Sequence, residues 1–119
     1  HNYAKAGLML RSSLNPDASL FLINAFPDGS ILLAWRSSDG AIMEQKIIGQ
    51  VSLPVLLRMR RKGSFLDVGF STDGTNWTKT RVHMTAKLAL NGYAGLAVLS
   101  HDNRFLTTAS FDNIRFESR

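Results

Sequence analysis

Arg11 and His101 are well placed for polar chemistry, because each ends a short apolar stretch that is rich in small residues. The two stretches, Lys5–Ser12 and Tyr93–His101, share the tripeptide Ala-Gly-Leu, and both are typical of buried central strands. Side chains alternate between the faces of a strand, so one face of each stretch has little bulk and ends in a guanidinium or an imidazole. If the strands are neighbours, they form the floor of a shallow groove with polar groups at one end.

Arg36 is a second candidate for this groove. In the predicted strand Ser30–Arg36, a bulky apolar set that includes Trp35 alternates with a set that ends at Arg36. If Trp35 is a core residue, Arg36 lies on the opposite face, and we therefore add it to the candidate ligand contacts.

We expect no enzyme activity. Acid–base chemistry on sugars needs paired carboxylates, whereas Glu44 and Glu117 are the only glutamates and neither has an acidic residue two positions away. His1 and His83 are isolated, and there is no metal-ligand spacing, phosphate loop or nucleophile elbow. We expect no cofactor, with calcium kept as an alternative without an assigned ligand set, because that ion prefers about six to eight oxygens. The oxygen-bearing pairs considered for calcium are Asn15 with Asp17, Asp102 with Asn103, and Asp112 with Asn113.

Composition indicates one globular domain. The 119 residues are enough to bury a core, and the 45% hydrophobic content excludes a disordered chain. No apolar run reaches the roughly 18 to 20 residues of a membrane span, and there is no cysteine. The net charge of +5 raises the question of nucleic acid, but the only basic cluster, Arg58–Lys62, has no aromatic residues interleaved. We predict a solvated strand edge there, with neither a nucleic-acid partner nor membrane insertion.

Turn signals recur about every 8 to 12 residues, and no window shows a helical period over three turns, which predicts an all-β antiparallel protein. The expected strands are Lys5–Ser12, Ser19–Phe26, Ser30–Arg36, Ala41–Ile48, Val55–Arg61, Phe65–Ser71, Thr78–Met84, Tyr93–Ser100 and Thr107–Phe116. Charge falls on one face of Ala41–Ile48, as in an edge strand. The clearest hairpin turns at Asp73-Gly74, with Trp77 predicted to fold back over the turn in a structural role.

Six motifs follow one another along nearly the whole chain. They are Ala4–Ser13, Pro27–Gly29 with Leu33–Arg36, Arg58–Gly63 with Phe65, Ser71–Trp77, Tyr93–His101 and Ala109–Ile114. Together they resemble the concanavalin A-like (LamG-type, laminin-G-like) jelly-roll domains that are appended to secreted bacterial glycoside hydrolases and to surface proteins.

This resemblance implies an antiparallel two-sheet jelly-roll sandwich that acts as a non-catalytic, carbohydrate-binding accessory module outside the cell or at its surface. Its implied partner is a polysaccharide or glycan. Family members carry several strands before the segment that matches Ala4–Arg11, so residues 1–119 are expected to form a single domain that is the C-terminal part of a longer one. The missing strands would then come from the remainder of the parent polypeptide.

Carried over by motif, Arg11, Arg36 and His101 match polar positions of the family, and Asp102 and Asn103 follow in the rim loop. These five residues are the expected ligand contacts. In the alternative interpretation, Arg11 and His101 form a polar network that closes the strand ends, and Asp102-Asn103 is a turn. The alternative function is a structural or protein-interaction module of a surface or fibre assembly with no sugar ligand.

Overall fold

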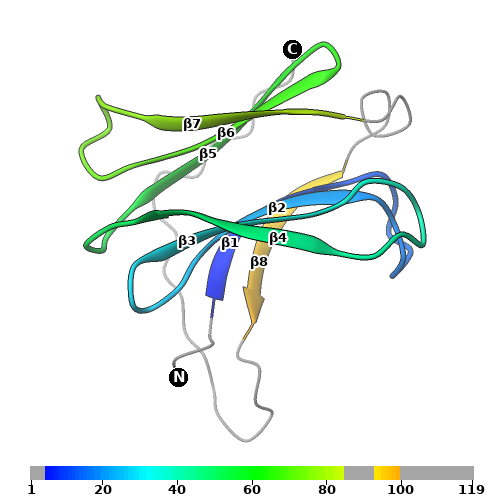
Figure 1. The fold of residues 1–119 in the computed structure, drawn as a ribbon, viewed down its shortest axis with the longest axis horizontal. Coiled ribbons are helices and arrows are strands. Elements are labelled where there is room, and N and C mark those ends of the chain that lie inside the picture. The colour runs from blue at the N-terminus through cyan, green and yellow to red at the C-terminus, as the bar shows by residue number, and fades with distance from the viewer. Residues whose placement is uncertain (1–4, 85–92, 100–119) are drawn as a thin grey trace, which may run out of the picture.

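Eight β-strands in two antiparallel sheets make up the part of the protein that the structure describes (Figure 1). The structure is a computed structural model, and it describes residues 5–84 and 93–99. The strands are β1 (Lys5–Arg11), β2 (Leu20–Ala25), β3 (Ser30–Arg36), β4 (Glu44–Gln50), β5 (Leu56–Lys62), β6 (Phe65–Ser71), β7 (Thr78–His83) and β8 (Tyr93–Leu99). No helix occurs within these ranges, and hence none that is long and apolar enough to cross a membrane.

The strands divide into a larger sheet of order β4-β3-β2-β1-β8 and a smaller sheet of order β5-β6-β7. Figure 1 shows the sheets as two layers. β1 and β8 pair along their whole length, from Lys5 opposite Leu99 to Arg11 opposite Tyr93. The all-β antiparallel class is confirmed, and so is the prediction that the two Ala-Gly-Leu stretches are neighbouring strands.

The core lies between the two layers and is built from alternate residues of both. Its largest cluster consists of Ile23, Ile31, Leu33, Val68 and Phe70. A second cluster consists of Phe21, Leu66 and Met84. Trp35 packs against both clusters, so its expected place in the core is confirmed, although the indole is only half-buried.

The layers approach each other closely where β4 meets β6. A Cβ atom added to Gly49 would lie 2.2 Å from Cζ of Phe70, which is too close for any side chain. Phe70 itself is buried. Glycine at this position therefore lets the aromatic ring of one sheet rest directly on the backbone of the other.

The opposite face of the larger sheet is also buried over its two central strands. Leu20, Asn24, Leu32 and Ala34 alternate with the core residues and are at most 8% exposed. The Asn24 side chain lies beside Gly7, where an added Cβ would stand 2.8 Å from the Asn24 Oδ1 atom. The Asn24 side chain thus covers Gly7, while the side chains of residues 96–99, which complete the predicted groove floor on β8, are not described.

Seven of the predicted strands have the observed limits to within one residue, but β4 begins later and ends later than predicted. The Ala41 amide donates to the Ser38 carbonyl oxygen at 3.0 Å, which closes a turn where the sequence suggested strand. The Ala41 carbonyl oxygen accepts a hydrogen bond from the Arg36 side chain. The alternation of side chains does not reveal this contact, so it could not predict where β4 begins. The expected strand Thr107–Phe116 lies outside the described residues.

The hairpin between β6 and β7 has the predicted architecture. Gly74 has a φ of 80°, and the Asp73 carboxylate accepts the amides of Thr75 and Asn76, both at 2.8 Å. The Trp77 Nε1 atom donates to the Gly74 carbonyl oxygen at 3.2 Å, so the indole folds back over the turn. Its contact with the turn is structural, as the sequence predicted.

Candidate functional site

Arg11 and Arg36 lie in one row across the larger sheet. Leu20 pairs with Arg11 on one side and with Arg36 on the other, which places all three side chains on the same face. The sequence predicts both arginines on the face opposite to Trp35, and the register agrees.

Their guanidinium groups hold loops together. Arg36 donates to the carbonyl oxygens of Ala41, Pro16 and Ala18 at 2.9, 3.0 and 3.2 Å. Arg11 donates in the same way to the carbonyl oxygens of residues 13 and 15. Donors that are engaged by the backbone are poorly free to bind a ligand, so this geometry fits a structural role better than direct recognition.

Asp39 extends this loop network. Its Oδ1 atom accepts the Ser19 amide at 2.9 Å and the Ser12 hydroxyl at 3.3 Å, which ties the loop before β4 to the loop between β1 and β2. The two arginines and Asp39 therefore set the shape of one end of the larger sheet. The other predicted contacts, His101, Asp102 and Asn103, lie outside the described residues.

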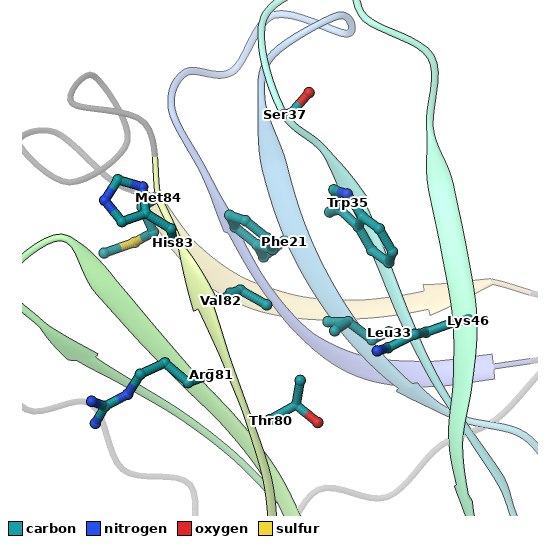
Figure 2. Close-up of a pocket in the computed structure, with 10 residues that line it drawn as sticks. All are labelled: Phe21, Leu33, Trp35, Ser37, Lys46, Thr80, Arg81, Val82, His83 and Met84. Atoms are coloured by element: carbon teal, nitrogen blue, oxygen red, sulfur yellow. The ribbon is translucent and has the colours of Figure 1, made fainter.

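A cleft of about 470 Å³ opens between the layers, on the side where β7 ends the smaller sheet (Figure 2). Phe21, Leu33 and Trp35 form its apolar floor on the larger sheet, and Val82 approaches them from β7. The larger sheet has five strands against three, and in the described ranges β4 has no partner beyond β3. This unequal width leaves Trp35 and Val82 only half-buried along one seam.

Polar groups surround this floor. Ser37, Lys46 and Thr80 line the cleft, and Figure 2 shows Lys46 reaching from β4 toward Leu33 while Arg81 points away from the floor. An apolar floor with a few convergent polar groups is the usual composition of a small-molecule site.

Trp35 is held in a defined orientation at the cleft. Its Nε1 atom donates to the Glu44 Oε2 atom at 3.0 Å, across the pair that joins β3 to β4. Leu33 pairs with Lys46 in the same ladder, so the charged face of β4 is the one that borders the floor. In the sequence, the only signal for this cleft was the alternation that placed charge on one face of the fourth strand. That alternation did not reveal that the charged face would lie beside Leu33 and Trp35 of β3.

The side chains that line the cleft can bind a ligand. An indole can pack on the apolar face of a ligand ring, while hydroxyl and ammonium groups bind ligand oxygens. Glu44 orients the indole from outside the cleft lining, and in the described ranges no group of three metal-ligating side chains could hold an ion.

Comparison of the chain with protein-family models, with curated proteins and with solved structures finds no match. The resemblance to concanavalin A-like domains therefore stands as a hypothesis that rests on the six sequence motifs.

Proposed function

We propose that this chain is a non-catalytic carbohydrate-binding accessory module of a secreted bacterial protein, with a jelly-roll sandwich fold of the concanavalin A-like type. The observation that supports this function is the oriented indole of Trp35 on the floor of the cleft, next to Ser37, Lys46 and Thr80. The volume of about 470 Å³ falls in the range of roughly 300 to 1,000 Å³ that ligand pockets occupy.

A sugar ring fits this arrangement in its chemistry. Its C–H face is apolar and packs on an aromatic ring, while its hydroxyl groups need donors and acceptors at the edge. Trp35 would supply the flat surface, and the Thr80 hydroxyl and the Lys46 ammonium would contact the ring oxygens and hydroxyls. Hydrolysis would need a pair of carboxylates about 5 to 10 Å apart, and none of the described residues that line the cleft carries a carboxylate.

Affinity electrophoresis of the folded chain in gels that contain single polysaccharides tests this function. Trp35→Leu keeps an apolar side chain and removes the flat ring. The affinity for a polysaccharide that retards the natural chain should therefore fall about tenfold. Thr80→Val keeps the shape and removes one hydroxyl, and should weaken binding several-fold. Thr78→Val makes the same change on the same strand at a position outside the cleft and should bind as the natural chain does.

Circular dichroism shows whether each variant is folded. Undiminished binding by both folded cleft variants would place the ligand elsewhere. Absence of retention on every polysaccharide, by a chain shown to be folded, would reject the carbohydrate-binding function.

The second candidate is a structural or protein-interaction module, in which the seam receives a strand from the remainder of the parent polypeptide. Two features favour it: the cleft is bordered by β4 and β7, each paired on one side within the described ranges, and Arg36 is engaged by loop carbonyls. Hydrogen exchange of the β4 and β7 amides distinguishes the two candidates. If these amides are strongly protected from exchange in the longer parent chain but not in residues 1–119, the result would favour insertion of a further strand. If they exchange equally in both, the result would favour an open sugar site.

A further inference from the structure

One face of the smaller sheet, directed away from the core, is strongly basic. The strand registers set three rows across β5, β6 and β7, which are Arg58-Gly69-Lys79, Arg60-Asp67-Arg81 and Lys62-Phe65-His83. The intervening residues Leu66 and Val68 are buried in the core, so the three rows face outward. We call Arg58, Arg60, Lys62, Lys79 and Arg81 the basic face.

Aromatic residues fix two of these cations. The Cζ atom of Arg58 lies 3.9 Å from the centroid of the Trp77 ring, and that of Arg81 lies 5.5 Å from the centroid of Phe65. The indole of Trp77 lies beside Gly69, where an added Cβ would be 3.6 Å from the Trp77 Cε3 atom, an ordinary van der Waals contact. Guanidinium groups held in this way lose less side-chain freedom when they bind a ligand.

Asp67 shows that the basic face accepts a carboxylate. Arg81 donates to both of its oxygens, at 2.8 and 3.1 Å, and the Lys62 Nζ atom lies 3.9 Å away. The hydrogen bond from Arg81, followed by the charges of Arg81, Lys62 and Lys79, holds the pKa of the Asp67 carboxyl below its ordinary value. This two-bond fork is the geometry in which arginine recognises carboxylates in general.

The cations along β5 exceed what this single carboxylate can neutralise. Arg58 and Arg60 project from the same side of one strand, and the pKa of Arg58 is lowered, first by burial and then by the charge of Arg60. Lys79 adds a further positive charge in the row of Arg58. An anionic chain lying along β5 would relieve this repulsion.

We propose that the basic face binds a carboxylate-bearing polysaccharide, at a site separate from the cleft. Arg58, Arg60 and Lys79 contact its carboxylates, while Asp67 holds Arg81 in position. Carboxylates occur at regular intervals along such a polymer. On the outer face of β5, cations occur at every second residue of the strand.

Two contacts disfavour single-stranded nucleic acid at this face. Binding of bases relies on open aromatic faces for stacking, but Arg58 lies over Trp77, and the ring of His83 meets Phe65 at 5.2 Å and 85°. The basic cluster lies on β5, which is an edge strand of the smaller sheet within the described residues, as predicted, and aromatic residues hold two cations of the outer face to which it belongs.

Affinity electrophoresis with polygalacturonate, a polymer of uronic acid, tests the proposal, with dextran as the neutral reference. The folded chain should be retarded by polygalacturonate alone, and increasingly less so as salt rises. Arg58→Gln, Arg60→Gln and Lys79→Gln combined should weaken this binding at least about tenfold, and Arg60→Gln alone about threefold. Arg61→Gln is the matched control, because it removes one charge from the same strand at a position that pairs with the buried Leu66.

Each outcome decides the proposal. It is supported if the combined variant, folded by circular dichroism, loses binding while Arg61→Gln changes it less than twofold and Trp35→Leu leaves it unchanged. It is overturned if the combined variant binds as the natural chain does, or if Arg61→Gln weakens binding as much as Arg60→Gln. Tighter binding to oligo-dT or to vesicles of anionic lipid than to polygalacturonate would also overturn it.

Discussion

Replacement of Gly49 by alanine tests the contact that sets the spacing of the two sheets. The new methyl group would stand 2.2 Å from Cζ of Phe70 and about 3 Å from two further ring atoms, so the ring or the sheet must move. Overpacking of this kind costs about 1 to 3 kcal/mol, while alanine regains about 0.5 to 1 kcal/mol over glycine in a strand. We therefore expect a net loss of about 1 kcal/mol, and at most about 2.5 kcal/mol, with each kcal/mol lowering the melting temperature by roughly 4 °C in a chain of this size.

Thermal and urea unfolding followed by circular dichroism measure this loss. Gly95→Ala is the matched control, because it is also a strand glycine but no atom of the described residues lies within 4 Å of the added Cβ, and it should be neutral or slightly stabilising. Phe70→Leu replaces the opposing ring by a smaller side chain. The double variant Gly49→Ala with Phe70→Leu should therefore lose at least about 0.5 kcal/mol less unfolding free energy than the sum of the two single variants. Equal stability of Gly49→Ala and Gly95→Ala would refute the close approach of the sheets.

Two further changes probe the loops. Arg36→Lys keeps the charge but loses the planar guanidinium group that donates to three carbonyl oxygens. The free energy of unfolding, measured in urea, should fall by about 1 to 2 kcal/mol, and a fall below about 0.3 kcal/mol would contradict the structural role. The amides of Asn76 and Thr75 hold the pKa of Asp73 below its ordinary value of 3.8, so its charge stabilises the fold above that pH and less as the pH falls below it. The natural protein should be more stable than Asp73→Asn near pH 6, and the difference in stability should shrink below about pH 4. A difference that is constant with pH would show that the charge of Asp73 is not its cause.

Predictions of the fold succeeded where the signal was local. The turn at Asp73-Gly74 was readable because few residues adopt positive φ, and strand β6 was readable because Leu66 and Val68 alternate with polar or small residues. The predicted start of β4 was wrong because the Ala41 amide closes a turn with the Ser38 carbonyl oxygen and the Ala41 carbonyl oxygen accepts from Arg36, contacts that side-chain alternation does not encode.

Predictions of the site were less complete for a physical reason. The alternation placed Arg11 and Arg36 on one face, and the register agrees, but it could not show that Arg36 would meet the carbonyls of a distant loop. It also placed Trp35 in the core without indicating that the indole would border a cleft. Nor did the basic cluster in β5 reveal Trp77 as a partner of Arg58.

The sequence by itself determined the strand intervals, the main turns and the two-fold alternation of faces, because each depends on residues within a few positions of one another. Only the tertiary structure decided which faces meet and which are left uncovered. Strand order, the unequal widths of the two sheets and the seam beside Trp35 arise from pairing between segments far apart in the chain, which local patterns do not encode.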